Sequence, residues 1–137
     1  MQNSKYLILS IFAALVSLVS CNRSDDPTFA QKIALTTDSV SIPSDTITLG
    51  STLQITTYHK LAENCELFQG YSTSDLGNEK LITAYYFKSD STCGNPSIST
   101  AFMIFTPKRS GTFHLKFWKE NNQWIEKTLE VLPLTTP

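Results

Sequence analysis

Cysteine is the side chain with the widest chemistry in this sequence, which holds three of them in 137 residues. A thiolate is a nucleophile and a metal ligand, and two thiols can be oxidised to a disulfide. Cys21 comes directly after an apolar run at the N-terminus, whereas Cys65 and Cys93 lie within the body of the chain. These positions set Cys21 apart and predict different chemistry for it.

The N-terminal segment has the layout of an export signal. Lys5 precedes an apolar run over residues 6–19, which is shorter than the roughly 20 residues that a helix needs to span a membrane. The run ends in LVSC at residues 18–21, which resembles the lipobox of bacterial lipoproteins. This resemblance implies cleavage before Cys21, attachment of diacylglycerol to its thiol, and acylation of the new N-terminus by fatty acids such as palmitate.

The five residues after Cys21, NRSDD, bear on where the anchored protein would lie. They resemble the acidic tag that some Gram-negative bacteria place after the lipidated cysteine of surface-displayed lipoproteins. A polar run of this kind is also the composition of a solvated tether, so we expect an outer-membrane anchor with surface exposure as one of two alternatives. The expected organisation is a signal peptide over 1–20, a lipidated N-terminus and flexible tether over 21–30, one domain over 31–133 and a tail over 134–137.

Charge narrows the expected partners. Removal of residues 1–20 would also remove Lys5, which leaves ten basic and twelve acidic side chains and a net charge of −2. Without a basic patch, nucleic acid is not expected as a partner. The expected partners are the membrane, through the lipid anchor, and an envelope protein or glycan.

Cys65 and Cys93 remain as an even pair once Cys21 is lipidated. In an exported protein such a pair predicts a disulfide, which would close a loop of about 29 residues and stabilise the fold by roughly 3.5 kcal/mol. Two free thiols or half of a metal site are the alternatives. The sequence has no CxxC spacing and only two histidines, so it does not predict a zinc site.

The chain after Ala30 consists of short runs rich in Thr, Ile, Val, Tyr and Phe, separated by Gly, Pro, Asn, Asp and Ser. This is the pattern of β-strands joined by turns, and seven to eight strands in about 100 residues predict one antiparallel β-sandwich. The runs KLITAYYFK and ISTAFMIF are apolar on both faces and are expected as central strands. Strands are expected over 31–35 with 38–42, and over 46–49, 52–59, 64–71, 80–88, 97–106, 112–118 and 124–132.

The C-terminal stretch FTPKRSGTFHLKFWKENNQWIEKTLEVLP resembles the closing hairpin of bacterial immunoglobulin-like domains, which implies an immunoglobulin-like sandwich. No tryptophan lies between the two cysteines of the pair, so a disulfide of the antibody type is not implied. A two-residue turn in this hairpin would place Glu126 opposite Phe117, on the core face. A three-residue loop over 120–122 places Ile125 there instead, and this register is expected because a one-residue slip exchanges the two faces of a strand.

In that register Trp118 and Trp124 become cross-strand partners on the outer face of the hairpin. Two exposed indoles offer a flat surface for a sugar ring or for the apolar surface of a partner protein. The alternative is a structural role, in which the pair stabilises the hairpin by roughly 0.2–1 kcal/mol or packs under a loop.

Other residues with chemical potential show no functional spacing. His59 and His114 are expected to be polar surface side chains, because neither has a carboxylate at ligand spacing. Glu63 and Glu66 could form the carboxylate pair of a glycosidase, but nothing singles them out. The sequence contains no nucleophile elbow, phosphate loop or calcium loop, so no catalytic residue, metal or cofactor is expected.

The expected function is that of a lipid-anchored, non-catalytic binding module of the cell envelope, which binds a glycan or a protein. One alternative is a structural accessory subunit of an envelope complex with no soluble ligand. Another is a small-ligand-binding β-barrel. A permanently docked subunit should have a broad apolar face, whereas a displayed binding module should have a compact aromatic one.

Lipidation of Cys21 can be tested with radiolabelled palmitate. The wild-type protein should incorporate the label, and Cys21→Ala should lose it, because the acceptor thiol is removed. Cys93→Ala should keep the label, since that thiol lies outside the lipobox. Label that persists in Cys21→Ala would contradict the anchor.

Overall fold

A computed structural model of the chain describes residues 32–62, 66–88 and 94–134. The described residues contain nine β-strands and no α-helix, which confirms the expected all-β sandwich with one strand more than expected. The strands are β1 (Ile33–Leu35), β2 (Thr37–Ser41), β3 (Thr46–Thr48), β4 (Leu53–Leu61), β5 (Glu66–Leu76), β6 (Glu79–Lys88), β7 (Ser97–Phe105), β8 (Gly111–Trp118) and β9 (Trp124–Leu132).

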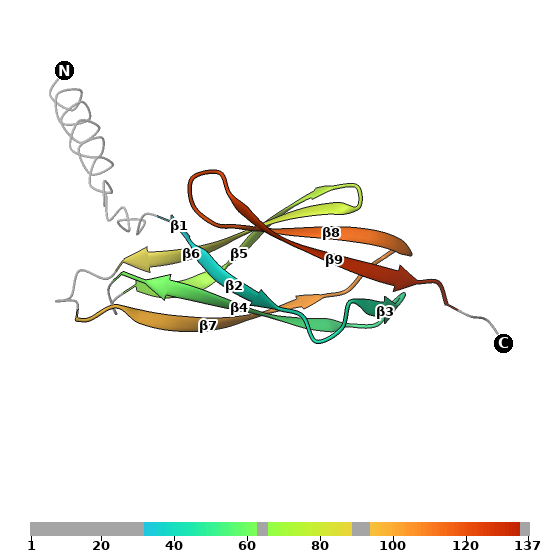
Figure 1. Cartoon of the computed structure of the whole chain (residues 1–137), viewed down its shortest axis with the longest axis horizontal. Coiled ribbons are helices and arrows are strands. Elements are labelled where there is room, and N and C mark those ends of the chain that lie inside the picture. The colour runs from blue at the N-terminus through green and yellow to red at the C-terminus, as the bar shows by residue number, and fades with distance from the viewer. Residues whose placement is uncertain (1–31, 63–65, 89–93, 135–137) are drawn as a thin grey trace, which may run out of the picture.

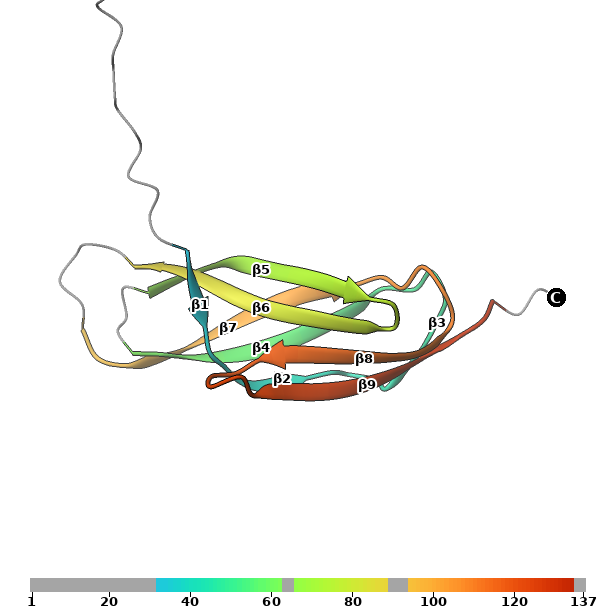
Figure 2. The ribbon, with the colours of Figure 1, turned by 90° about the horizontal axis from the view of Figure 1, so that it is seen from above.

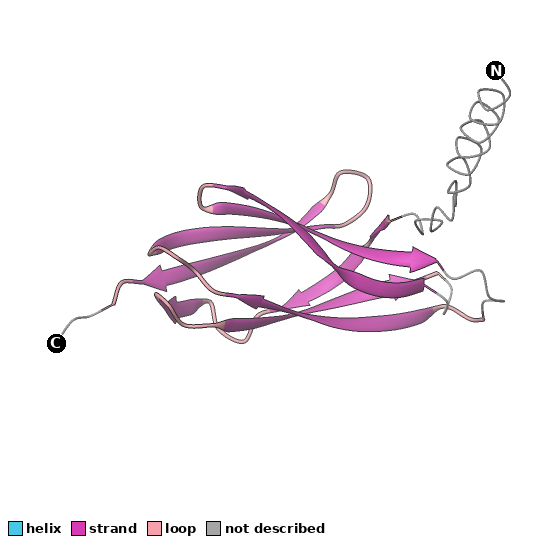
Figure 3. Ribbon diagram, turned by 180° about the vertical axis from the view of Figure 1, so that it is seen from behind, coloured by secondary structure: helices cyan, strands magenta, loops and turns pink. Residues whose placement is uncertain are grey.

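The strands form two sheets that lie one above the other (Figure 1). The larger sheet has the order β1-β6-β8-β9-β3, with β5 also paired to β6, and the smaller sheet has the order β2-β4-β7. Most neighbours are antiparallel, but β3 pairs with β9 and β6 with β8 in parallel, which the expected antiparallel sandwich did not include. Figure 3 shows the strands from behind, joined by short loops.

The two runs that are apolar on both faces differ in their position. KLITAYYFK falls in β6, which has β5 on one side and both β1 and β8 on the other, so its expected central place is confirmed. ISTAFMIF falls in β7, which is the last strand of the smaller sheet, and its expected central place is wrong. A run that is apolar on both faces shows neither that both faces are covered nor that both backbone edges are paired.

The connection between β5 and β6 is shorter than expected. Residues 72–79 were expected as a loop, but β5 continues to Leu76 and the turn is confined to Gly77 and Asn78. The side chains over 72–76 are exposed on both faces, so this part of the strand has no hydrophobic alternation in its sequence. Figure 2 shows the β5–β6 hairpin along one side of the sandwich, with its tip at the end opposite β1.

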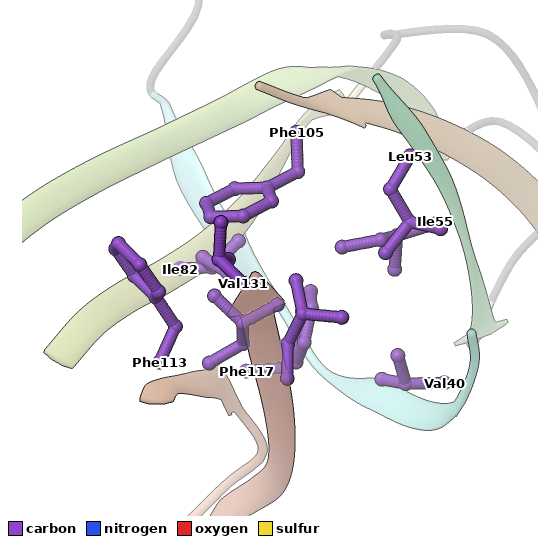
Figure 4. Close-up of a cluster of buried hydrophobic side chains, with 10 residues drawn as sticks. Val40, Leu53, Ile55, Ile82, Phe105, Phe113, Phe117 and Val131 are labelled. Carbon is purple, nitrogen blue, oxygen red and sulfur yellow. The ribbon is translucent and has the colours of Figure 1, made fainter. Parts of the chain in front are cut away.

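The main core lies between the two sheets (Figure 4). Strand β8 contributes Phe113, Leu115 and Phe117 from one face, and all three are buried. Burial of each such side chain contributes roughly 1.5–3 kcal/mol. The remaining buried members of the cluster are Val40, Leu53, Ile55, Ile82, Phe105, Leu129 and Val131.

The register of the β8–β9 hairpin is the expected one. Phe117 pairs with Ile125, and the loop over 120–122 is closed by two 2.9 Å hydrogen bonds, from the Lys119 N–H to the Gln123 carbonyl and from the Gln123 N–H to the Glu120 carbonyl. Asn121 and Asn122 have φ values of 54° and 58°, in the left-handed region that asparagine tolerates better than most residues. The loop therefore uses the residues best suited to its backbone.

This register can be tested by truncation of neighbouring side chains on β9. Leu129→Ala should lower the free energy of unfolding by about 2–5 kcal/mol, because Leu129 is fully buried in the core. Thr128→Ala should change it by less than about 0.5 kcal/mol, because Thr128 faces solvent. Urea denaturation measures both, and a larger loss for Thr128→Ala would contradict the register.

Candidate functional site

The outer surface of the β8–β9 hairpin carries the predicted tryptophan pair. Trp118 and Trp124 are cross-strand partners, as expected, with Trp118 partly buried and Trp124 38% exposed. His114, Lys116 and Glu126 lie on the same face, and we refer to these five residues as the tryptophan face. The structure therefore brings the two indoles together on a surface that a ligand can reach.

Charges on the tryptophan face already have partners. Lys116 Nζ donates to Glu79 Oε1 over 3.0 Å, and this hydrogen bond raises the pKa of Lys116. His114 lies at the surface, as expected, but its Nδ1 is 3.1 Å from Glu126 Oε1, a diagonal cross-strand contact that spacing along one strand did not reveal. Because these polar side chains already contact one another, a ligand on this face would be held mainly by stacking on the indoles.

His59 is fully buried, so its expected place at the surface is wrong. The inner face of β4 consists of every second residue from Leu53 to Leu61, and His59 occupies one of these positions. The hydrophobic alternation at the start of the strand already contained this information. The polar character of the side chain led to the incorrect expectation.

A chain of hydrogen bonds satisfies the buried His59 ring. Its Nδ1 lies 3.2 Å from the Thr36 carbonyl, which can only accept, so Nδ1 carries the proton and Nε2 accepts. Thr57 Oγ1 lies 2.7 Å from Nε2 and 2.5 Å from the Tyr71 hydroxyl, so Tyr71 donates to Thr57, which donates to His59. Burial lowers the pKa of His59 and raises that of Tyr71, which keeps both side chains neutral at pH 7.

Aromatic rings cover the same network. The His59 ring stacks on Phe68 with a centroid distance of 5.8 Å, and Phe68 meets Tyr71 edge to face at 5.0 Å. Among the described residues, no buried side-chain nitrogen or oxygen lacks a hydrogen-bond partner. The arrangement therefore fixes the packing of β4 against β5, and we assign it a structural role.

The outer face of β7 is apolar and was not singled out from the sequence as a site. Ile98, Phe102 and Ile104 are 68%, 59% and 62% exposed, and we call these three residues the β7 strip. The apolar character of this run was visible in the sequence, but exposure depends on what covers the strand. The residues opposite them on β4 are polar: Gln54, Thr56 and Lys60.

Several predicted site residues lie outside the described residues, namely Cys21, Cys65, Cys93 and Glu63. Glu66 is described and buried, and its Oε2 accepts a 2.9 Å hydrogen bond from the Ala62 N–H, which stabilises the local backbone. The described part of the chain holds no group of three or more His, Cys, Asp or Glu side chains that could bind a metal ion.

No helix in the described ranges has the length and hydropathy needed to cross a membrane. Comparison with protein-family models, with curated proteins and with solved structures finds no match for this chain.

The buried state of His59 predicts a pH-dependent stability. Because burial lowers the pKa of His59 below 6.5, the unfolded chain binds a proton at pH values where the folded chain does not. The free energy of unfolding should therefore be highest above pH 6.5 and fall as the pH decreases toward the folded pKa. Urea midpoints between pH 7.5 and 5 measure this change.

His59→Leu should reduce the pH-dependent fall, whereas His114→Gln at the surface should preserve it. The comparison is made within each variant, so a constant loss of stability in His59→Leu does not affect the outcome. An unchanged pH profile in His59→Leu would contradict the assignment.

Proposed function

We propose that this chain is a lipid-anchored lipoprotein of a bacterial outer membrane and a non-catalytic binding module for another protein. The anchor is supported by the LVSC sequence at residues 18–21 and by the apolar run before it. The observation that carries the binding role is the unprotected edge of β7. An immunoglobulin-like arrangement is supported by the β2-β4-β7 sheet, although the parallel β6–β8 pairing departs from antibody-type domains.

Edge strands normally carry features that prevent unwanted pairing, such as short length, charges, prolines or bulges. The other edges among the described residues have such features. Strands β1 and β3 are only three residues long, and β2 has an irregular register next to Asp38, which forms an ion pair with Lys60. Strand β5 has a register shift between Phe68 and Gly70.

Strand β7 has none of these features. It is nine residues long, contains no charge, proline or glycine, and pairs with β4 through nine consecutive residues without a bulge. Its other edge has no partner strand in the described part of the chain. A long, regular and apolar edge of this kind pairs readily with another strand, so it predicts that a partner covers it.

The partner that fits this edge is an extended segment of another protein. Backbone pairing to β7 would supply affinity, and the β7 strip would select apolar side chains at alternate positions of the added strand. The strip is one strand wide and borders the mainly polar face of β4, so it suits a displayed binding module better than a subunit docked over a broad face.

A glycan is the second candidate ligand, favoured by the exposure of Trp124 beside Trp118. Sugar rings stack on indole surfaces, and the compensated charges of the tryptophan face would not oppose a neutral glycan. The two candidates use different sheets, because the tryptophan face belongs to the larger sheet and the β7 strip to the smaller one. A variant can therefore remove one surface without the other.

The protein-binding role can be tested by site-specific photocrosslinking in intact cells. A benzophenone amino acid in place of Thr100, between Ile98 and Phe102 on the same face, should give one discrete crosslinked product. Phe102→Lys in the same protein should abolish it, because a charge enters the apolar strip. Mass spectrometry then identifies the product.

Leu76→Lys provides the matched control, since Leu76 is 60% exposed and Phe102 59%. It should leave the crosslink unchanged. The double variant Trp118→Ala/Trp124→Ala should also leave it unchanged, and loss of the crosslink in that variant would place binding on the tryptophan face. A crosslink that survives Phe102→Lys would contradict the proposed role of β7.

A further inference from the structure

A pocket of about 430 Å³ opens at one end of the sandwich, apart from the surfaces described above. The β5–β6 hairpin forms one wall with Asp75 and Lys80, and residues 106–109 of the β7–β8 connection form the other. The buried rings of Phe105 and Phe113 line it from the core side and meet edge to face, with centroids 5.6 Å apart. Figures 1 and 2 both show these segments at the end away from the start of β1.

Positive charge is in excess around this pocket. Lys80, Lys108 and Arg109 line it, against the single carboxylate of Asp75. Lys80 forms an ion pair with Asp75, which leaves the charges of Lys108 and Arg109 without a carboxylate among the lining residues. Since the whole chain has a net charge of −1, this local excess is opposite in sign to the molecule as a whole. The pocket therefore favours an anion.

Two of the cations are held in place before any ligand binds. Arg109 Nη2 donates a hydrogen bond to the Gly77 carbonyl, which joins the two walls, and the guanidinium carbon lies 5.8 Å from the centroid of the Phe113 ring. Lys80 Nζ lies 5.9 Å from the centroid of the Phe105 ring. Contacts of this kind restrict the side chains and lower the entropy lost on binding.

We propose that this pocket binds a small organic anion. Its carboxylate or phosphate group would lie between Lys108 and Arg109, because a guanidinium matches both groups with paired N–H donors. Its ring or apolar part would lie against Phe105 and Phe113. The volume is in the range of small-molecule sites.

This site is independent of the proposed protein-binding role. Phe105 belongs to the inner face of β7, whereas the β7 strip belongs to the outer face. A ligand in the pocket therefore touches none of the residues of the β7 strip. An experiment can therefore contradict one of the two proposals without contradicting the other.

Saturation-transfer difference NMR on the mature lipidated chain in lipid nanodiscs tests the pocket. Galacturonate and phenyl phosphate are the anionic probes, galactose is the neutral counterpart of the first, and empty nanodiscs give the background. We expect transfer to at least one anionic probe and little to galactose. Transfer to galacturonate or to phenyl phosphate shows whether the site accepts a carboxylate or a phosphate. Transfer to galactose as strong as that to the accepted anionic probe, or transfer to neither anion, would overturn the proposal.

Two variants locate the site. Arg109→Gln and Lys108→Gln should each weaken binding of the accepted probe by about 10-fold or more, because each removes a charge-assisted contact. Lys108 is exposed, so Lys108→Gln tests the pocket even if Arg109→Gln disturbs the contact with Gly77. Lys119→Gln removes the same charge from the β8–β9 hairpin and should leave binding unchanged. Unchanged binding in both pocket variants would overturn the assignment.

Two further measurements separate this proposal from its alternatives. Inorganic phosphate should compete with phenyl phosphate only at much higher concentration, since it has no part that contacts Phe105 and Phe113. If inorganic phosphate competes at the same concentration as phenyl phosphate, the proposal that the ligand has an organic part against Phe105 and Phe113 is overturned. Phe102→Lys should leave probe binding unchanged, and Arg109→Gln should leave the β7 crosslink unchanged. Loss of probe binding in Phe102→Lys would overturn the placement of the ligand in this pocket.

Discussion

Side chains alternate between the two faces of a β-strand, so the length of a single loop decides which residues enter the core. In the β8–β9 hairpin this loop covers residues 120–122, and its two asparagines adopt the positive φ values that the loop requires. Because of it, Ile125 and Leu129 lie opposite Phe117 and Phe113 on the core face; a loop one residue shorter would place Glu126 and Glu130 there instead. Strands β6 and β3 pair directly with this hairpin, so the larger sheet is aligned on the same register.

The parts of the fold that could be predicted follow from this local alternation. The pairing of Phe117 with Ile125 could be predicted from residue spacing, since the alternative register would place Glu126 and Glu130 on the core face, whereas this one leaves only Lys127 there, opposite Leu115. The burial of His59 was equally available from the alternation of β4. It was missed because a polar side chain on an inner face requires partners such as Thr57, which the sequence does not identify as partners.

The β7 strip and the pocket could not be predicted, because they depend on which segments become neighbours. The sequence of β7 is equally consistent with a central strand and with an edge, and only the strand order shows that, among the described strands, its second edge has no neighbour. The pocket joins two connections that are distant in the sequence, through the contact of Arg109 with Gly77. The parallel pairing of β6 with β8, which brings Glu79 to Lys116, depends on the same long-range arrangement.

Strand β1 is the first part of the sandwich that the chain reaches from its N-terminal side, and only a three-residue ladder holds it to β6. Its buried residue is Leu35, which packs in a small cluster with Leu61 and Ala84, apart from the main core. A mechanical pull on the N-terminal side therefore loads this ladder first, and its loss costs about 1.5–3 kcal/mol of burial at Leu35. Release of β1 lengthens the N-terminal tether by about 10 Å, while the packing of the core around Phe117 is unchanged. In a lipid-anchored chain under tension, β1 would detach from β6 before the rest of the domain unfolds.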